Sequence, residues 1–164
     1  MQKTWVRILT TGMTLGIMLM IFLFSAQNGD QSGSVSGTIT GQVIRLLRKD
    51  YDALSPAERK AYYDRVDLVI RKTGHFTEFA ALGFWLRLCL ESWAGKRRWL
   101  FPTAWLGGTA WAALDEVHQL FVDSRAGQVA DVAIDSAGVL FGVLAAQGLL
   151  RLIRKKRRER GGES

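Results

Sequence analysis

The 164-residue sequence has little cysteine, little proline and none of the common hydrolase motifs. Its single cysteine, Cys89, excludes an intramolecular disulfide framework and every metal site that needs several cysteines. Two prolines and 17 glycines without a repeat exclude collagen-like and proline-rich chains. The chain also lacks Gly-x-Ser-x-Gly, Ser-x-x-Lys and His-Glu-x-x-His, the signatures of several hydrolases and zinc proteases. The fold and function must therefore be inferred from where the apolar and charged residues lie.

One long apolar run dominates the N-terminal part of the chain. Residues 8–29 contain no charge, and 22 residues are enough to cross about 30 Å of hydrocarbon. A cleaved signal peptide is the competing interpretation, but the run is too long and no small-x-small cleavage site follows it. Three weaker apolar segments, 73–91, 99–122 and 129–153, carry their charges clustered at one end.

The four segments predict a single all-α integral membrane domain with four transmembrane helices. The spans are expected at about 8–27, 73–92, 99–118 and 131–151. Only the first passes a strict hydropathy test, so a soluble domain on one anchor stays as the alternative. Uncharged stretches at 99–114 and 136–150 favour helices that each have one polar end.

Lys and Arg residues predict the orientation of these spans. They lie before the first span, at positions 96–98 between the second and third, and in the basic tail, residues 152–164. Positive charge favours the cytoplasmic side, so both termini are expected in the cytoplasm of a multi-pass plasma (inner) membrane protein. The net charge of +7 first suggests nucleic acid. Its concentration directly after a span indicates orientation and anionic-lipid contact instead, and no nucleic-acid partner is expected.

The outer segment, residues 28–72, is predicted to be helical. Its apolar residues recur at helical spacing and predict an amphipathic helix on the membrane: Val35, Ile39, Val43, Leu46 and Leu47. Ser55, Pro56 and Glu58 form a capping-box pattern. The helix that starts there leads into the second span, either with a bend at Gly74 or as one continuous helix.

Small residues at four-residue spacing predict close helix packing in two places. The pairs are Gly12 with Gly16 and Gly138 with Gly142.

The charges that interrupt the weak spans all fall in one layer. At 1.5 Å per residue, Glu78, Asp115 and Asp135 each lie about 22–24 Å from the cytoplasmic end of their helix. Because unpaired charge is costly in hydrocarbon, these side chains should face one another. The sequence therefore predicts one polar pocket, open to the outside. Its other predicted members are Gln27, Arg71, Lys72, His75, Glu116, His118, Gln119, Arg125 and Asp131.

Four stretches in this layer, taken in order, resemble the successive motifs of the VanZ-like family. They are 24–27 (FSAQ), 71–79 (RKTGHFTEF), 115–125 (DEVHQLFVDSR) and 131–138 (DVAIDSAG). The similarity extends from about residue 20 to 150, and the family varies near the arginine, where Asp123-Ser124 stands here. The resemblance implies a small bacterial membrane protein whose founding relative is associated with teicoplanin resistance, and it supplies no reaction.

The leading interpretation is a pocket that binds the headgroup of an outer-leaflet lipid or of a lipid-linked cell-wall precursor. Cations in the layer suit phosphate, and carboxylates and amides such as Gln27 and Gln119 suit sugars or peptides. A plainer alternative is that the charges only hold the helix ends together. Carboxylates outnumber cations near the layer, which favours a site.

A membrane enzyme is the alternative function. Glu78, Asp135 or His75 would act as acid or base on a lipid-linked phosphate or glycan, while Arg71, Lys72 and Arg125 hold the phosphate. A divalent metal is the one possible cofactor, and no other is expected. Its candidate ligands are His75, Glu78, Asp115, His118 and Asp135.

Overall fold

The computed structural model describes residues 4–26, 29–122 and 129–161, and this part of the chain is helical apart from short connections. Its five α-helices are α1 (Thr4–Ser25), α2 (Gly29–Leu47), α3 (Pro56–Ala94), α4 (Leu100–Gln119) and α5 (Val129–Gly161). A 3-10 turn, η1 (Tyr51–Ala53), lies between α2 and α3. The all-α prediction is confirmed for these residues.

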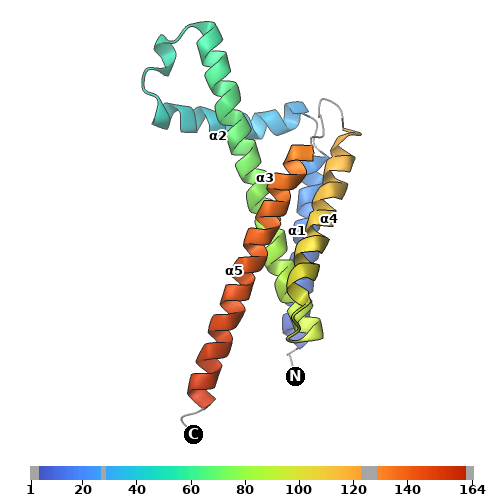
Figure 1. The fold of residues 1–164 in the computed structure, drawn as a ribbon. Coiled ribbons are helices and arrows are strands. Elements are labelled where there is room, and N and C mark those ends of the chain that lie inside the picture. Colours follow the sequence, from blue (N-terminus) through green and yellow to red (C-terminus); the bar gives the residue numbers. More distant parts are fainter. Residues whose placement is uncertain (1–3, 27–28, 123–128, 162–164) are drawn as a thin grey trace.

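Four of the helices, α1, α3, α4 and α5, pack side by side in a bundle (Figure 1). The pair α3 and α5 shares the most extensive interface, whereas α2 lies across one end of the bundle and packs on α3. Both chain ends lie at the other end of the bundle (Figure 1). Below, the α2 end is the one that holds Ser25, Gln119 and Asp131, and the terminal end is the one that holds Thr4, Gly95 and Gly161.

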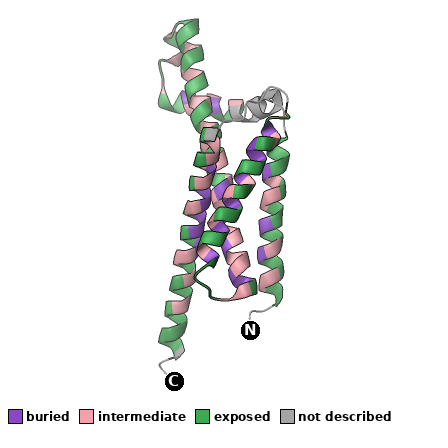
Figure 2. Cartoon of the chain, turned by 45° about the vertical axis from the view of Figure 1, so that its right-hand side comes forward, coloured by how far each residue is buried: buried purple, intermediate pink, exposed green. Residues whose placement is uncertain are grey.

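The core lies where the four bundle helices meet, and large apolar side chains also cover the outside of the bundle. The buried core residues are Ile21, Phe79, Leu82, Ala104, Ala112, Val139 and Val143. Leu15 on α1, Leu106 on α4 and Phe141 on α5 are more than half exposed. Figure 2 shows this alternation along each helix, with buried positions facing the neighbouring helices. Extensive exposed apolar surface is unfavourable in water and suits a lipid environment.

Two described helices are long and apolar enough to cross a membrane. They are α1, Thr4–Ser25, and the part of α5 from Ala130 to Arg160. Helices α3 and α4 carry the charged residues noted above and fall below the same threshold of apolar character. The four predicted spans therefore correspond to four bundle helices, but the hydropathy criterion supports only two of them as spans.

The start of α3 is defined by local hydrogen bonding. Ser55 accepts from the backbone N–H of Glu58, and the Glu58 carboxylate accepts from the backbone N–H of Ser55 at 3.0 Å. Pro56 occupies the first turn, where no N–H donor is needed. The predicted capping box is confirmed. The helix then runs through Gly74 without interruption to Ala94, which decides for one continuous helix, and Gly95 ends it with φ of 67°.

One of the two predicted small-residue contacts is confirmed and the other is wrong. A Cβ at Gly142 would overlap the carbonyl oxygen of Ala80, and one at Gly138 would meet the carbonyl oxygen of Phe76, so both glycines let α5 approach α3 closely. Gly12 and Gly16 face open space, with no neighbouring atom within 4 Å of the place that a Cβ would occupy. The four-residue spacing alone does not say which face of a helix meets a neighbour.

Helix α2 has two distinct faces. Thr40 and Ile44 are buried, and the Thr40 hydroxyl donates to the Asp67 carboxylate of α3 at 2.9 Å. Ile39, Leu46 and Leu47, which belong to the predicted amphipathic face, are exposed. Of the predicted apolar face, Ile39, Leu46 and Leu47 thus stay available to a membrane surface, Val43 is half-buried, and the side chain of Val35 lies outside the described residues.

Helix α5 extends beyond the predicted span. The sequence places its cytoplasmic boundary at residue 151, but the helix continues to Gly161 through the residues assigned to the basic tail. Beyond residue 151 the helix contains Leu152, Ile153 and then mostly Lys and Arg, which are good helix formers, and Lys155 pairs with Glu159 one turn later.

Candidate functional site in the helix bundle

The deep acids predicted from the sequence come together at the α2 end of the bundle. Asp135 on α5 lies close enough to Asp115 and Glu116 on α4, to Asp131 on its own helix and to Glu78 on α3 for their charges to interact. These five carboxylates, called the acid cluster below, come from three helices. Because like charges repel strongly in a poorly solvated environment, the cluster favours a cationic or hydrogen-bond-donating partner.

Asp115 is held by hydrogen bonds from two helices. The Ser25 hydroxyl at the end of α1 donates to Asp115 Oδ2 at 2.7 Å. Gln119, one turn further along α4, donates from Nε2 to the same oxygen at 3.0 Å. All three side chains are buried. The second carboxylate oxygen, Asp115 Oδ1, has no hydrogen-bond partner among the described residues.

Asp135 is the most deeply buried member of the acid cluster. It is 1% exposed, and its Oδ1 also lacks a hydrogen-bond partner within the described part of the chain. Leaving a buried acceptor unmatched costs about 1–3 kcal/mol, and more when the group is charged. The acid cluster thus contains two carboxyl oxygens without a partner among the described residues, Asp115 Oδ1 and Asp135 Oδ1, and both can accept a hydrogen bond from a ligand.

The edge of the cluster is more accessible and contains a cation. Lys72 Nζ lies 2.7 Å from Asp131 Oδ1, and both side chains are about one-third exposed. This ion pair links α3 to α5 and is of the kind expected if the charges hold the helix ends together. Arg71, the neighbouring candidate, is exposed.

The histidines occupy different surroundings. His118 on α4 stacks on Phe22 of α1, with ring centroids 4.5 Å apart, and its buried Nε2 has no hydrogen-bond partner in the described residues. His75 lies half-buried on α3, one turn before Glu78, and both take part in interactions there, as does Glu116 on α4. The catalytic candidates Glu78, Asp135 and His75 are thus placed on two adjacent helices.

Two predicted site residues and the metal hypothesis gain no structural support. Gln27 and Arg125 lie outside the described residues. Within the described ranges, no three His, Cys, Asp or Glu side chains are gathered as a metal site requires. The candidate ligands His75, Glu78, Asp115, His118 and Asp135 are thus not gathered into such a group among the described residues, and the metal site stays a prediction.

A family model, VanZ/LLP1, matches residues 11–152. The chain belongs to the VanZ/LLP1 family. The matched range contains all four motifs quoted above, and the structure brings Ser25, Lys72, Asp115, Asp131 and Asp135 together from those motifs. The resemblance inferred from the motifs is confirmed by this match. No curated protein and no solved structure matches the chain.

Family membership and two long apolar helices identify this VanZ/LLP1 chain as a membrane protein. The link to glycopeptide resistance, and to teicoplanin in particular, comes with the family name.

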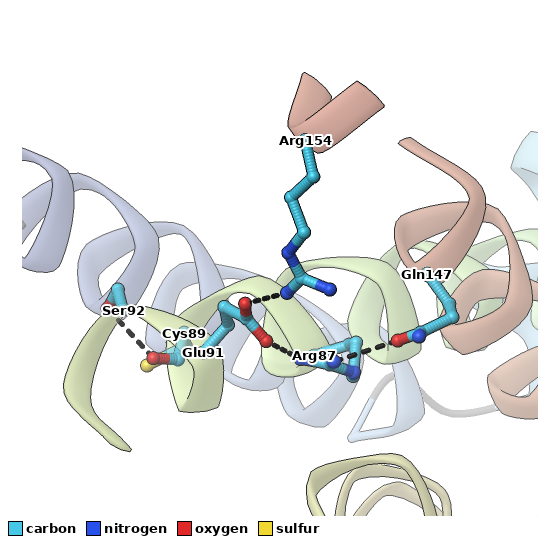
Figure 3. A network of polar contacts seen from close by, with 6 residues as sticks. All are labelled: Arg87, Cys89, Glu91, Ser92, Gln147 and Arg154. Atoms are coloured by element: carbon cyan, nitrogen blue, oxygen red, sulfur yellow. Dashed lines mark hydrogen bonds and ion pairs between the residues drawn. The ribbon is translucent and has the colours of Figure 1, made fainter. Parts of the chain in front are cut away.

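A second charged network lies at the terminal end of this VanZ/LLP1 bundle, between α3 and α5 (Figure 3). Arg87 is 2% exposed and donates from Nη1 to Glu91 Oε2 at 3.0 Å and from Nη2 to Gln147 Oε1 at 2.7 Å. Glu91 also pairs with Arg154 of α5 through its other oxygen. The network ties the two longest helices together away from the acid cluster.

Sequence reasoning missed the roles of Ser25, Arg87 and Glu91. Ser25 lies in a quoted motif, but its hydroxyl carries no charge, and its role as a donor to Asp115 can be recognised only when α1 and α4 are placed side by side. Arg87 and Glu91 are four residues apart, a spacing that predicts an ion pair on a helix face, and this signal was present in the sequence. Their burial depends on α5, which the spacing does not reveal.

Proposed function

We propose that the chain spans the membrane four times, with the α2 end outside, and that the acid cluster binds the headgroup of an envelope lipid or of a lipid-linked cell-wall precursor. The partner must carry hydrogen-bond donors or positive charge, because the cluster presents carboxylate oxygens. Glycopeptide susceptibility would change through occupancy or transport of that lipid, in keeping with the family name.

The burial of charge in α4 supports its assignment as a span. Asp115 and Glu116, which lower the hydropathy of this helix, are only 4% and 7% exposed. The exposed side of the same helix carries Leu106, Leu114 and Val117. A helix that hides its charges in the bundle and shows apolar side chains outside can lie in lipid although its average hydropathy is modest.

The positions of the basic residues support the orientation. Both chain ends lie at the terminal end, together with the connection 95–99 that contains three Lys/Arg residues (Figure 1). Under the positive-inside rule this end faces the cytoplasm. The acid cluster at the α2 end then lies near the outer headgroup layer.

The single observation that carries the binding proposal is the buried carboxylate of Asp135. It is 1% exposed, its Oδ1 is unmatched within the described residues, and Asp115 beside it presents a second unmatched oxygen. A hydroxyl, amide or ammonium group of a ligand would satisfy both. Lys72 and Asp131 at the accessible edge then lie where a headgroup would enter.

Lipid co-purification tests this proposal. The wild type, Asp135→Asn and Asp64→Asn are purified from native membranes, and bound lipids are identified by mass spectrometry. Asp64 is a matched control because it is exposed on α3 and pairs with Lys60 in a surface ion pair. Loss of one hydrogen bond to a charged group lowers affinity by about tenfold, so Asp135→Asn should lose most of the co-purifying lipid and Asp64→Asn should keep it.

The outcomes separate binding from the alternatives. Equal amounts of the same lipids in all three proteins would overturn the binding proposal and leave a structural role for the acids. Lipid that is bound but chemically altered by the wild type and unaltered by Asp135→Asn would favour the enzyme alternative. Unchanged helical content by circular dichroism excludes misfolding as the cause.

A further inference from the structure

The terminal end of the bundle contains a pocket of about 510 Å³ whose lining is strongly basic. Six of its ten lining residues are cations: Arg87, Lys96, Arg97, Arg98, Arg151 and Arg154. No acidic side chain is among the described residues that line it, and Glu91 behind the wall pairs with Arg87 and Arg154. Six positive charges with one nearby acid leave a net local charge of about +5, which favours an anionic occupant.

A buried, partly unmatched arginine sits in the wall of this pocket. Arg87 is 2% exposed, and its Nη1 and Nη2 are matched by Glu91 and Gln147. Its Nε is buried and has no hydrogen-bond partner among the described residues. Because guanidinium cannot release its proton, this donor can be satisfied only by an acceptor.

We infer that this pocket binds a phosphate group. Arginine forks match the oxygens of phosphate in geometry and charge, and several of them converge here from α3, α5 and the connection 95–99. The volume is large enough for a phosphate headgroup with part of its glycerol. The site lies at the opposite end from the acid cluster and does not depend on what that cluster binds.

The surroundings favour a membrane lipid as the source of the phosphate. Phe101 and Leu144 add apolar surface to the lining. Trp93 lies just before the connection 95–99 and Trp99 ends it, both are more than half exposed, and exposed tryptophans of this kind mark the membrane interface. A lipid whose headgroup enters the basic pocket can thus leave its acyl chains along the apolar outside of the bundle.

The test compares two double variants of the full-length chain. Arg97→Gln/Arg98→Gln removes two exposed cations from the pocket, and Arg157→Gln/Arg158→Gln removes two exposed cations from α5 outside the lining. Titration with dioleoylphosphatidylglycerol or dioleoylphosphatidylcholine in neutral detergent is followed by native mass spectrometry. Inorganic diphosphate is titrated separately by calorimetry, so that a lipid source and a soluble source are distinguished.

We expect the wild type to bind phosphatidylglycerol about tenfold more tightly than phosphatidylcholine, and the pocket variant to lose about tenfold in affinity. The control variant should change less than about twofold. Arg151→Gln, which removes a lining cation from α5 without altering the connection 95–99, should weaken binding in the same direction. Diphosphate binding that the pocket variant alone loses would support a soluble phosphate source.

Two results would overturn the inference. One is an equal loss of affinity for phosphatidylglycerol in both double variants, which would mean that the lipid is held by general electrostatic attraction and not by this pocket. The other is equal affinity for the two lipids together with no binding of diphosphate. Circular dichroism of each variant checks that the helices remain formed.

Discussion

Each end of the bundle buries an ionisable side chain, Arg87 between α3 and α5 and Asp135 among acids of α3, α4 and α5, but the two differ in their hydrogen bonds. Arg87 at the terminal end has two of its three nitrogens matched, by a carboxylate and an amide. Asp135 at the α2 end has an oxygen with no partner among the described residues and lies among other acids. Its two matched nitrogens tie Arg87 into the helix packing and leave only Nε for a ligand, whereas Asp135 lies among like charges with an unmatched oxygen.

The sign of the charge also differs between the ends. The acid cluster has five carboxylates, one of which, Asp131, pairs with Lys72. The basic pocket has six cations, and Glu91 is the acid paired with two of them. The difference teaches that the net charge of +7, taken over the whole chain, describes neither of these oppositely charged sites.

The largest expected effect is at the terminal end. Glu91→Gln removes the carboxylate that faces two arginines and leaves Arg87 buried without a counter-charge. Breaking a buried pair from one side costs about 3–5 kcal/mol. Unfolding in mixed micelles with increasing dodecyl sulfate, followed by circular dichroism, measures the loss.

Glu159→Gln is the matched control for Glu91→Gln. Glu159 lies on α5 and faces Lys155 at 3.9 Å in an exposed pair, so the change should cost less than about 0.5 kcal/mol. Similar small losses in both variants would show that the ion pairs of Glu91 add little to stability, and would remove the contrast between a matched Arg87 and an unmatched Asp135.

A smaller effect is expected between the two ends, where α3 and α5 touch. Gly142→Ala places a methyl group against the backbone of Ala80 and Phe84, which forces the helices apart and costs about 1–3 kcal/mol. Gly148→Ala on the same helix meets no atom within 4 Å and should stabilise the helix by up to about 1 kcal/mol. The same unfolding assay compares them, and loss of stability in both would show that helix propensity does not govern position 148.

Of the three main substitutions, the one at Asp135 has the smallest expected effect, and this effect is stabilising. Asp135→Asn replaces a buried carboxyl, which has an unmatched oxygen and lies among other acids, by a neutral amide, so in the absence of ligand it should raise stability by about 1 kcal/mol. Asp131→Asn, one turn away, breaks the pair with Lys72 and should lower stability by up to about 1 kcal/mol. A marked loss of thermal stability in Asp135→Asn would show that Asp135, like Arg87, stabilises the packing of the helices, and the proposed difference between the two residues would be wrong.

Much of the fold was predictable because its signals are local. The capping box at Ser55 and Glu58 depends on four consecutive residues, and the apolar run of α1 needs no partner to be recognised. The acid cluster was predictable from helix rise, since residues at equal depth in antiparallel helices meet when the helices pack. The predicted helix contact at Gly12 and Gly16 is wrong because residue spacing defines one face of a helix but does not say whether a neighbouring helix packs against that face.

The parts that were not predictable depend on contacts between distant segments. Ser25 and Asp115 are 90 residues apart, and only the packing of α1 against α4 turns a serine at a helix end into a hydrogen-bond donor to a buried carboxylate. Arg87 and Arg154 are brought to Glu91 by α3 and α5 together. The basic pocket likewise combines α3, α5 and the connection 95–99, which are separate in the sequence.

The sequence by itself determined that this protein is helical, that it contains at least one membrane-length apolar helix, and that its acids and bases separate along the helix axes. The position of a charge along the bundle follows from counting residues, because each residue of a helix adds a fixed rise along the helix axis. The tertiary structure decided which charges are matched. Matching needs atoms from different helices within about 3 Å, and only packing of α1, α3, α4 and α5 leaves Arg87 with two partners and Asp135 with an open oxygen.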